Sequence, residues 1–246
     1  ISRFFTEEFS GDRFVLTGEN ARHAAKSLRM QPGEKLTLCD GNGLEAVCVI
    51  EEIGSDRVEG AVLHRAPSQS EPNLSVVLYQ GVPKSDKMDL IVQKSVELGV
   101  TEIVPTVMRR CISRPDEAGA KKKTVRWQKI AREAAQQSGR GRIPTVQESM
   151  PLKKAVERAA KAGRVLVFYE GGGQSLRQLA DSLTPGETVS VFIGPEGGLD
   201  EGDLQVLREA GAETATLGPR ILRTETAPLA ALTALMLLSG NMEIGR

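Results

Sequence analysis

The sequence has few of the residues on which metal sites and disulfide frameworks depend. The 246-residue chain contains three cysteines and two histidines. Cys39, Cys48 and Cys111 are an odd number without CxxC spacing, which argues against a disulfide framework and against a zinc site. With only His23 and His64, a histidine-based metal cluster is disfavoured as well. We therefore expect chemistry that needs no bound metal.

Long apolar runs are also missing. No apolar stretch approaches the roughly 20 residues that span a bilayer. The most apolar segment, Leu229 to Leu238, is too short and lies at the wrong end of the chain for a signal peptide. Hydrophobic residues make up 40% and charged residues 26% of the chain, as in ordinary soluble globular proteins. We expect a cytoplasmic protein without a membrane segment.

The chain has no net charge, but its charges are unevenly distributed. Residues 1–83 carry 8 basic and 12 acidic residues, residues 84–142 carry 14 and 7, and residues 143–246 carry 10 and 13. A basic centre between acidic flanks is what a binding surface for phosphates requires. The run Lys121-Lys122-Lys123 fits that surface and fits an ordinary solvated segment equally well.

The first 70 residues have the pattern of a small β domain. Residues 35–39 alternate, Asp40 to Gly43 form a turn, and residues 44–53 run back as the second strand of a hairpin. A further turn at 54–56 leads into a strand at 57–63, and residues 20–29 fit a short helix. Short strands joined by tight turns suggest a small barrel. The proline- and serine-rich stretch 64–73 has linker composition, so we place a domain boundary at residue 70.

From residue 71 to residue 246 strands and helices alternate, which predicts an α/β domain with a parallel sheet covered on both faces. The expected strands are 74–79, 102–104, 165–169, 189–193 and 214–217. The expected helices are 85–98, 124–138, 153–162, 175–183, 200–210 and 227–239. The last helix is apolar almost all round, so it has to be buried on more than one side.

Two glycine-bearing turns near the C-terminus are the most informative local feature. Residues 193–198 read Ile-Gly-Pro-Glu-Gly-Gly directly after one strand, and residues 217–227 read LGPRILRTETA directly after the next. Each is a strand that runs into a loop and then a helix, where an open α/β sheet presents backbone N–H groups to a ligand. Glycine lets the backbone approach that ligand closely. Turn and cap glycines are the plainer explanation, but two such loops after consecutive strands favour a ligand site.

The two common nucleotide-binding motifs are absent. The segment after the first strand of the expected sheet, residues 80–85, reads QGVPKS and does not match G-x-G-x-x-G. The sequence G-x-x-x-x-G-K-[ST] occurs nowhere in the chain. A dinucleotide-dependent oxidoreductase and a P-loop NTPase are therefore disfavoured.

Five segments taken together resemble the RsmE family of SPOUT-class methyltransferases. They are the two glycine loops, residues 83–100, residues 126–144, and His23 with residues 28–33, and they follow the family's order over nearly the whole chain. The resemblance implies a PUA-like RNA-binding barrel over residues 1–70 and a methyltransferase domain with a trefoil knot over residues 71–246. It also implies methyl transfer from S-adenosylmethionine to N3 of a uridine in 16S ribosomal RNA of the small subunit.

The resemblance implies a donor site at the knot loops. Its glycines allow close backbone approach, and Ile221 and Leu222 are expected to form apolar walls for the adenine. The residues Glu170 to Gly173 follow a strand and fit either a third wall or a flexible surface loop. The expected donor-binding residues are Tyr169, Glu170, Ile193, Gly194, Pro195, Glu196, Gly197, Gly198, Leu217, Gly218, Ile221, Leu222 and Arg223.

A neutral imide is a poor nucleophile, so the N3 proton must leave or the resulting anion must be stabilised. A cation near the uracil oxygens would act electrostatically, and a carboxylate could act as the base. Arg223 is the first candidate for the cation and Arg140 the second. Glu225 is assigned as the catalytic carboxylate, although Glu133 and Glu196 are also possible bases and Glu225 fits an ordinary helix N-terminus equally well.

Contacts with RNA are expected mostly from basic residues that fit phosphate groups. Gln137 is expected at the uracil edge, although the end of a helix explains it as well. A lone histidine is more often structural, so His23 is the weakest member. The expected RNA-binding residues are His23, Lys26, Arg29, Lys84, Arg109, Arg110, Arg114, Gln137, Arg140 and Arg142.

Two further expectations concern assembly and the alternative function. A symmetric partner is the commonest way to cover a helix that is apolar all round, and SPOUT relatives dimerise through their knot regions, so we expect a homodimer. Leu232, Leu235 or Met236 would lie at or just under its interface.

The alternative function is a non-catalytic RNA-binding protein of the same fold. The sequence decides neither the general base nor whether free RNA or an assembled subunit is the substrate.

Overall fold

The computed structural model describes residues 2–9, 11–112 and 117–243 and divides into two compact units. The first unit comprises residues 1–71 together with residues 135–143. The second comprises residues 72–134 and 144–246. The domain boundary expected at residue 70 stays a prediction. The first unit also includes residues 135–143, which the sequence analysis placed in the second domain.

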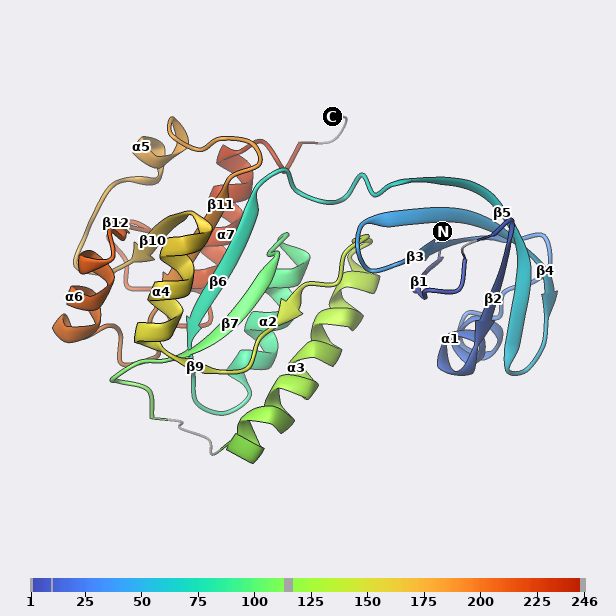
Figure 1. Ribbon diagram of the computed structural model, residues 1–246, viewed down its shortest axis with the longest axis horizontal. Helices are drawn as coiled ribbons and strands as arrows, with labels where there is room; N and C mark the ends of the chain where they lie inside the picture. The colour runs from blue at the N-terminus through green and yellow to red at the C-terminus, as the bar shows by residue number, and fades with distance from the viewer. Residues whose placement is uncertain (1, 10, 113–116, 244–246) are drawn as a thin grey trace. The chain divides into compact units, whose positions relative to one another are not determined.

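The first unit is built on a curled five-stranded sheet with the order β1-β3-β4-β5-β2 (Figure 1). β1 pairs with β3 in parallel, and the other neighbours are antiparallel. The expected hairpin of residues 35–39 and 44–53 is confirmed with the same bounds. The strands are β1 (Ser2–Phe5), β2 (Arg13–Thr17), β3 (Lys35–Cys39), β4 (Leu44–Ile53) and β5 (Arg57–Pro67).

The core of this unit lies on one face of the sheet. Phe4, Phe14, Leu36 and Leu38 are fully buried there, together with Ile50. β1 and β2 escaped sequence analysis because neither belongs to a hairpin with a recognisable turn. β5 continues to Pro67, so part of the expected linker is strand. Pairing of residues 64–67 with β4 outweighs their loop-like composition.

A short helical segment connects β2 to β3, where one helix was expected over residues 20–29. It consists of α1 (Gly18–Arg22) followed by a π-helical turn, η1 (His23–Ser27). The amide of Leu28 donates to the carbonyl of His23 and closes this wider turn. The side chains of residues 26–29, at the end of the segment, are exposed to solvent.

The segment of residues 135–143 is fastened to the rest of the first unit by hydrogen bonds to one carboxylate. Arg140 is only 4% exposed, and its Nη2 atom lies 2.7 Å from Oε2 of Glu71. The amides of Gly141 and Arg142 donate to Oε1 of the same carboxylate at 3.0 and 3.1 Å. The Arg140–Glu71 pair therefore stabilises the fold of this unit.

The second unit contains a seven-stranded sheet in which every pair is parallel. The order is β12-β10-β11-β6-β7-β8, with β9 also paired to β7 (Figure 1). The predicted α/β class with a parallel sheet is thus confirmed. The strands are β6 (Ser75–Gly81), β7 (Glu102–Val107), β8 (Thr145–Val146), β9 (Met150–Pro151), β10 (Arg164–Phe168), β11 (Thr188–Ile193) and β12 (Glu213–Ala215).

Helices cover both faces of this sheet. α4 and α6 lie in front of it in the view of Figure 1, and α7 and α2 lie behind it. The front core includes Tyr79 and Phe192, whose rings stack with centroids 4.4 Å apart. The helices are α2 (Lys87–Glu97), α3 (Glu117–Gln137), α4 (Leu152–Ala162), α5 (Leu176–Ala180), α6 (Glu201–Glu209) and α7 (Ala227–Leu238).

The final helix α7 is covered within the chain itself. α2, α5 and β6 all contact it, and Leu232, Leu235 and Met236 are buried. Because the sheet and two other helices cover different sides of α7, its burial does not require a partner chain, and the homodimer stays a prediction. Leu237 stays 60% exposed.

Candidate functional site

The loops that follow β10, β11 and β12 converge on one pocket of about 340 Å³. Parallel strands place their carboxyl ends at the same edge of a sheet, so loops that are distant in the sequence meet there. Every residue expected to bind the donor lines this pocket. Its other lining residues, which sequence analysis missed, are Lys87, Phe168, Thr216, Arg220, Thr224 and Ala227.

The missed residues differ in the signals that could have found them. Phe168 ends β10 and Thr216 directly follows β12, so position at a strand end could have indicated both. Thr224 lies in the second glycine loop, where its polar side chain was overlooked beside Arg223. Lys87 begins α2, far away in the sequence, and no local pattern connects it to the pocket.

The loop after β11 is held close to β6. A Cβ atom on Gly81, the last residue of β6, would lie 2.5 Å from the backbone nitrogen of Pro195, so only glycine fits there. Gly198 has a φ of +68°, which favours glycine, and its amide donates to the carbonyl of Pro195 at 2.8 Å. This wall of the pocket is therefore a tight backbone turn.

The loop before α7 forms the opposite wall and is tied to the first loop by buried hydrogen bonds. The Thr224 hydroxyl donates to the carbonyl of Gly194 at 2.8 Å and accepts from Nε2 of Gln80 at 3.0 Å. The Gln80 side chain, at the end of β6, is fully buried. A strand end and both pocket loops are thereby joined by one small polar network.

Gly218 gives this second wall room for a ligand. Its φ is +99°, and a Cβ atom added there would meet no protein atom within 4 Å. The positive φ explains why this position favours glycine, whereas steric crowding by neighbouring protein atoms does not. Gly218 is exposed, and the space beside it is open.

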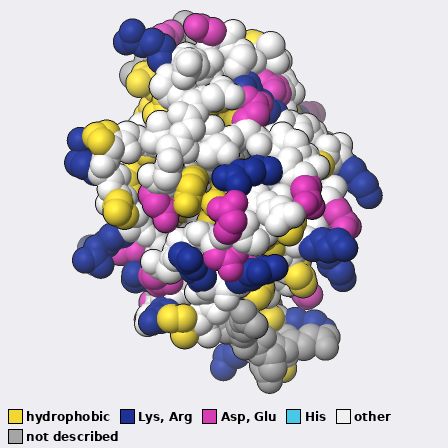
Figure 2. Space-filling model, turned by 90° about the vertical axis from the view of Figure 1, so that its left-hand side faces the viewer, with side chains coloured by type: hydrophobic (Ala, Val, Ile, Leu, Met, Phe, Trp, Pro, Cys, Tyr) yellow, Lys and Arg dark blue, Asp and Glu magenta, His cyan; other side chains and the backbone are white. Residues whose placement is uncertain are grey.

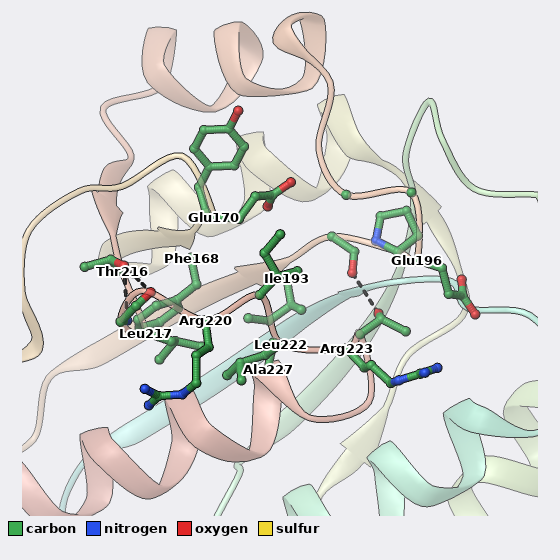
Figure 3. A pocket seen from close by; sticks show the side chains of 18 of the residues that line it. Phe168, Glu170, Ile193, Glu196, Thr216, Leu217, Arg220, Leu222, Arg223 and Ala227 are labelled. Carbon is green, nitrogen blue, oxygen red and sulfur yellow. Dashed lines mark hydrogen bonds between the residues drawn. The ribbon is translucent and has the colours of Figure 1, made fainter.

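Figure 3 shows apolar side chains in the middle and on one side of the pocket, with Thr216 and Arg220 beside them and Glu170 above, and a polar end at the other side. Phe168 and Leu217 lie on one side, Ile193 and Leu222 lie in the middle, and Glu196 and Arg223 lie at the other side. Ile221, expected as an apolar wall, also lines the pocket but is 85% exposed. A ligand with a flat apolar group and a charged group matches this division.

Three charged side chains form a cluster at the polar end. Lys87 Nζ lies 3.3 Å from Oε1 of Glu196 and 3.2 Å from Oε2 of Glu225. Burial by itself would raise the pKa of Glu225, but its own backbone N–H group and Lys87 outweigh burial and lower that pKa. The pKa of Glu196 is lowered as well. Burial by itself would raise it, but hydrogen bonds from backbone N–H groups and from Lys87 outweigh burial.

These pKa shifts bear on the expected catalytic carboxylate. A carboxylate whose pKa is lowered is a weaker base than an ordinary one. Catalysis by Glu225 stays a prediction, and the arrangement favours a role for Glu225 in charge pairing. Arg223, by contrast, is exposed at the polar end of the pocket, as a cation that meets a substrate must be.

The structure places the expected RNA-binding residues in several surroundings. Arg110 donates through Nη1 to the carbonyl of Gly197 at 2.8 Å, so it supports the pocket loop. Arg109 lies 4.0 Å from Asp200 and 3.9 Å from Asp203. Charges of both signs are intermixed on the face that Figure 2 displays. These arginines therefore have partners inside the second unit.

The remaining candidates are mostly exposed. Lys84 is exposed, and its amide donates to Glu196 at 3.0 Å. Arg114 lies outside the described residues. Arg140 is buried in its pair with Glu71, so its expected role beside the substrate stays a prediction that burial disfavours. The other exposed candidates are His23, Lys26, Arg29, Gln137 and Arg142.

The part of the chain that the structure describes contains neither a metal-binding cluster nor a membrane-spanning helix. Within residues 2–9, 11–112 and 117–243, no three His, Cys, Asp or Glu side chains are placed to hold a metal ion. Across the same part of the chain, no helix is both long enough and apolar enough to cross a membrane.

Comparisons with known proteins match both parts of the chain. Residues 70–236 match the RNA methyltransferase domain family, and residues 16–63 match the RNA methyltransferase PUA domain family. The chain is 37% identical to the ribosomal RNA small subunit methyltransferase E of Bacillus subtilis, over 90% of this chain and 89% of the relative. It is 34% identical to the protein of the same name from Mycobacterium tuberculosis, over 93% of this chain and 88% of that one.

Solved structures agree with these matches. The ribosomal RNA small subunit methyltransferase E of Neisseria gonorrhoeae, bound to S-adenosylmethionine, is similar with a TM-score of 0.86 and 35% identity, over 97% of this chain and 98% of that chain. A methyltransferase from Legionella pneumophila in complex with the same cofactor has a TM-score of 0.82 and 32% identity, over 96% of each chain.

Proposed function

The chain belongs to the ribosomal RNA small subunit methyltransferase E family, and from this premise we propose that it methylates N3 of a uridine in 16S ribosomal RNA. S-adenosylmethionine is the methyl donor, and the product is an N3-methyluridine. The observation that carries the proposal is the convergence of three strand-to-helix loops on one pocket in the second unit. Because the substrate is ribosomal RNA, we place the protein in the cytoplasm.

The residues of the pocket fit the donor. The apolar part around Leu217 and Leu222 suits an adenine ring, and the open space beside Gly218 lets a ligand approach the backbone. The polar end suits the charged amino acid part. When bound, the donor supplies an electrophilic methyl group whose C–S bond breaks as the N–C bond forms, with the electron pair staying on sulfur.

The chain's own residues would orient the acceptor and balance its charge. Arg223 would stabilise the uracil anion that remains when the N3 proton leaves, because a fixed cation near developing negative charge lowers the barrier. The base that takes this proton is not assigned. Exposed cations such as Lys26 and Arg29 in the first unit would contact phosphates and position the RNA.

We infer two further features from the same family. One is the trefoil knot, supported by the way the chain leaves edge strand β12 and ends in α7, which contacts α2 and β6. The other is a homodimer, supported by the exposure of Leu237 on α7. Light scattering at low micromolar concentration should report twice the 26.5 kDa mass of one chain. A fully active monomer would contradict the dimer.

The function is tested with purified protein, radiolabelled donor and small ribosomal subunits that lack the modification. Methyl incorporation should appear in 16S RNA at one uridine. It should also stop reverse transcriptase there, because an N3 methyl group blocks base pairing. RNA binding without donor binding or methyl incorporation would favour the alternative, a non-catalytic RNA-binding protein.

A further inference from the structure

Lys87 comes from a helix outside the pocket loops and carries a charge that contacts two of those loops at once. Glu196 belongs to the loop after β11, and Glu225 belongs to the loop before α7. The Lys87 ammonium lies 3.3 Å from the first carboxylate and 3.2 Å from the second. One cation from the start of α2 therefore connects two loops that meet only in the folded chain.

Lys87 supplies most of the counter-charge of Glu225, and Arg223 adds a weaker attraction. The Oε2 atom of Glu225 is buried and, among the described residues, makes no hydrogen bond of good geometry. A buried anion without a counter-charge is costly, so the nearby ammonium matters more here than on an open surface. Glu196 has additional support, since it accepts a hydrogen bond from the Lys84 amide.

The charges around the whole pocket nearly cancel. Three cationic and two anionic side chains line it, and Glu225 adjoins it as a third anion. Removing the charge of Lys87 would leave an excess negative charge at the polar end. The charged lining residues are Lys87, Arg220, Arg223, Glu170 and Glu196.

This balance matters because the donor and its product differ in charge at the reacting atom. S-adenosylmethionine carries a positive sulfonium, whereas the product S-adenosylhomocysteine carries a neutral thioether. An excess of negative charge in the pocket would stabilise the bound sulfonium more than the transition state, because the positive charge on sulfur is partly lost in the transition state. Such a pocket would hold the donor tightly and use it slowly.

We propose, on the basis of the donor-binding function above, that Lys87 is a specificity-determining residue that neutralises Glu196 and Glu225 so that the pocket does not favour the sulfonium over the thioether. It also positions the two loops. Positioning alone would change the Kd of both ligands by the same factor, whereas charge neutralisation changes the Kd of the cationic donor more than that of the neutral product and so changes their ratio. The two contributions can therefore be separated by measurement.

The experiment is calorimetric titration of both ligands into the wild type and three single variants at low salt. Lys87→Met removes the charge and keeps a long side chain, and Lys87→Arg keeps the charge. Lys94→Met is the matched control, because Lys94 lies on the same helix and pairs with Glu97 away from the pocket. Circular dichroism checks that each variant is folded.

In Lys87→Met the ratio of the Kd for S-adenosylhomocysteine to the Kd for S-adenosylmethionine should rise about fivefold, since a net negative charge favours the cationic ligand. Lys87→Arg and Lys94→Met should keep the wild-type ratio. The rise should shrink as salt is added. In the double variant Lys87→Met, Glu225→Gln, which has the same net charge as the wild type, the ratio should return towards the wild-type value.

Equal changes in both Kd values for Lys87→Met would overturn the proposal and leave Lys87 with a positioning role only. An unchanged ratio together with unchanged Kd values would overturn both parts. If the wild type bound neither ligand, the failure would belong to the proposed function and not to Lys87.

Discussion

The two units organise their polar side chains differently because their strands run differently. In the first unit most neighbouring strands are antiparallel, so successive loops leave the sheet at opposite ends. In the second unit every pair is parallel, so the loops after β10, β11 and β12 leave at one edge and enclose a pocket. Parallel topology therefore concentrates functional groups, whereas antiparallel topology spreads them over a surface.

The ion pairs of the two units differ in the same sense. Exposed pairs such as Arg22–Asp56 lie on the first unit, where the one deeply buried arginine among the described pairs, Arg140, fastens a chain segment. In the second unit Lys87 joins two pocket loops, and Arg110 supports one of them. Arg140 therefore fastens the fold of the first unit, whereas Lys87 and Arg110 shape the ligand site of the second, whose fold is also held by pairs such as Arg164–Glu213.

The comparison is tested most strongly at Gly218. A valine there has to adopt a φ near +99°, and its side chain would occupy the space beside the pocket wall. Gly218→Val should raise the Kd for S-adenosylmethionine by more than about 100-fold, on the scale of roughly 3 kcal/mol of lost binding. Calorimetry measures the affinity.

Gly211→Val is the matched control for this substitution. Gly211 has a φ of +82°, also meets no atom within 4 Å, and does not line the pocket. Both variants should lose similar stability, about 1–2 kcal/mol each, while only Gly218→Val loses affinity. Equal affinities in the two variants would remove Gly218 from the site.

The next largest effect is expected at Arg140. Arg140→Ala leaves the carboxylate of Glu71 without its buried cation, so it should destabilise the first unit by about 3 kcal/mol. Urea unfolding measures this loss. Donor affinity should stay unchanged, because Arg140 belongs to the first unit and the pocket to the second.

Arg22→Ala is the control, because it breaks an exposed pair with Asp56 and should cost less than about 1 kcal/mol. If the two arginine variants were equally stable, the structural role of Arg140 would be wrong. Its expected place beside the substrate would then regain support.

A smaller effect is expected at Arg110. Arg110→Ala removes the hydrogen bond to the carbonyl of Gly197, and a bond of this kind contributes about 1 kcal/mol. The Kd for the donor should therefore rise about fivefold. Arg208→Ala, which breaks an exposed pair with Glu201 on α6, should leave the Kd unchanged. No change in Arg110→Ala would mean that the pocket loop holds its shape without this arginine.

The smallest effect is expected at the cysteines of the first unit. Burial raises the pKa of Cys39 and Cys48 to about 11, so both stay protonated at pH 8, with about one thiolate in a thousand. Iodoacetamide at pH 8 should leave them unmodified in the folded protein, as read by mass spectrometry, and should modify them in urea. Arg140→Ala should speed their modification through unfolding of this unit. Rapid modification of the folded wild type would contradict their burial.

Local sequence patterns were sufficient to predict most of the helices and strands. The hairpin of β3 and β4 has the predicted bounds, because alternating side chains and a glycine turn are local signals. β11 and α7 also lie within one residue of their expected ends. β1 and β2 were missed because neither belongs to a hairpin with a recognisable turn, and α3 begins at residue 117, seven residues before its expected start.

The sequence by itself determined the α/β class and the glycine loops that line the pocket, because strand period, helix period and glycine turns are encoded within a few neighbouring residues. Only the tertiary structure decided that Lys87 joins Glu196 to Glu225, that Gln80 supports Thr224, and that Arg140 is buried against Glu71. Each of these contacts connects residues at least 69 positions apart, and such pairs meet only when strand order and helix packing bring them together.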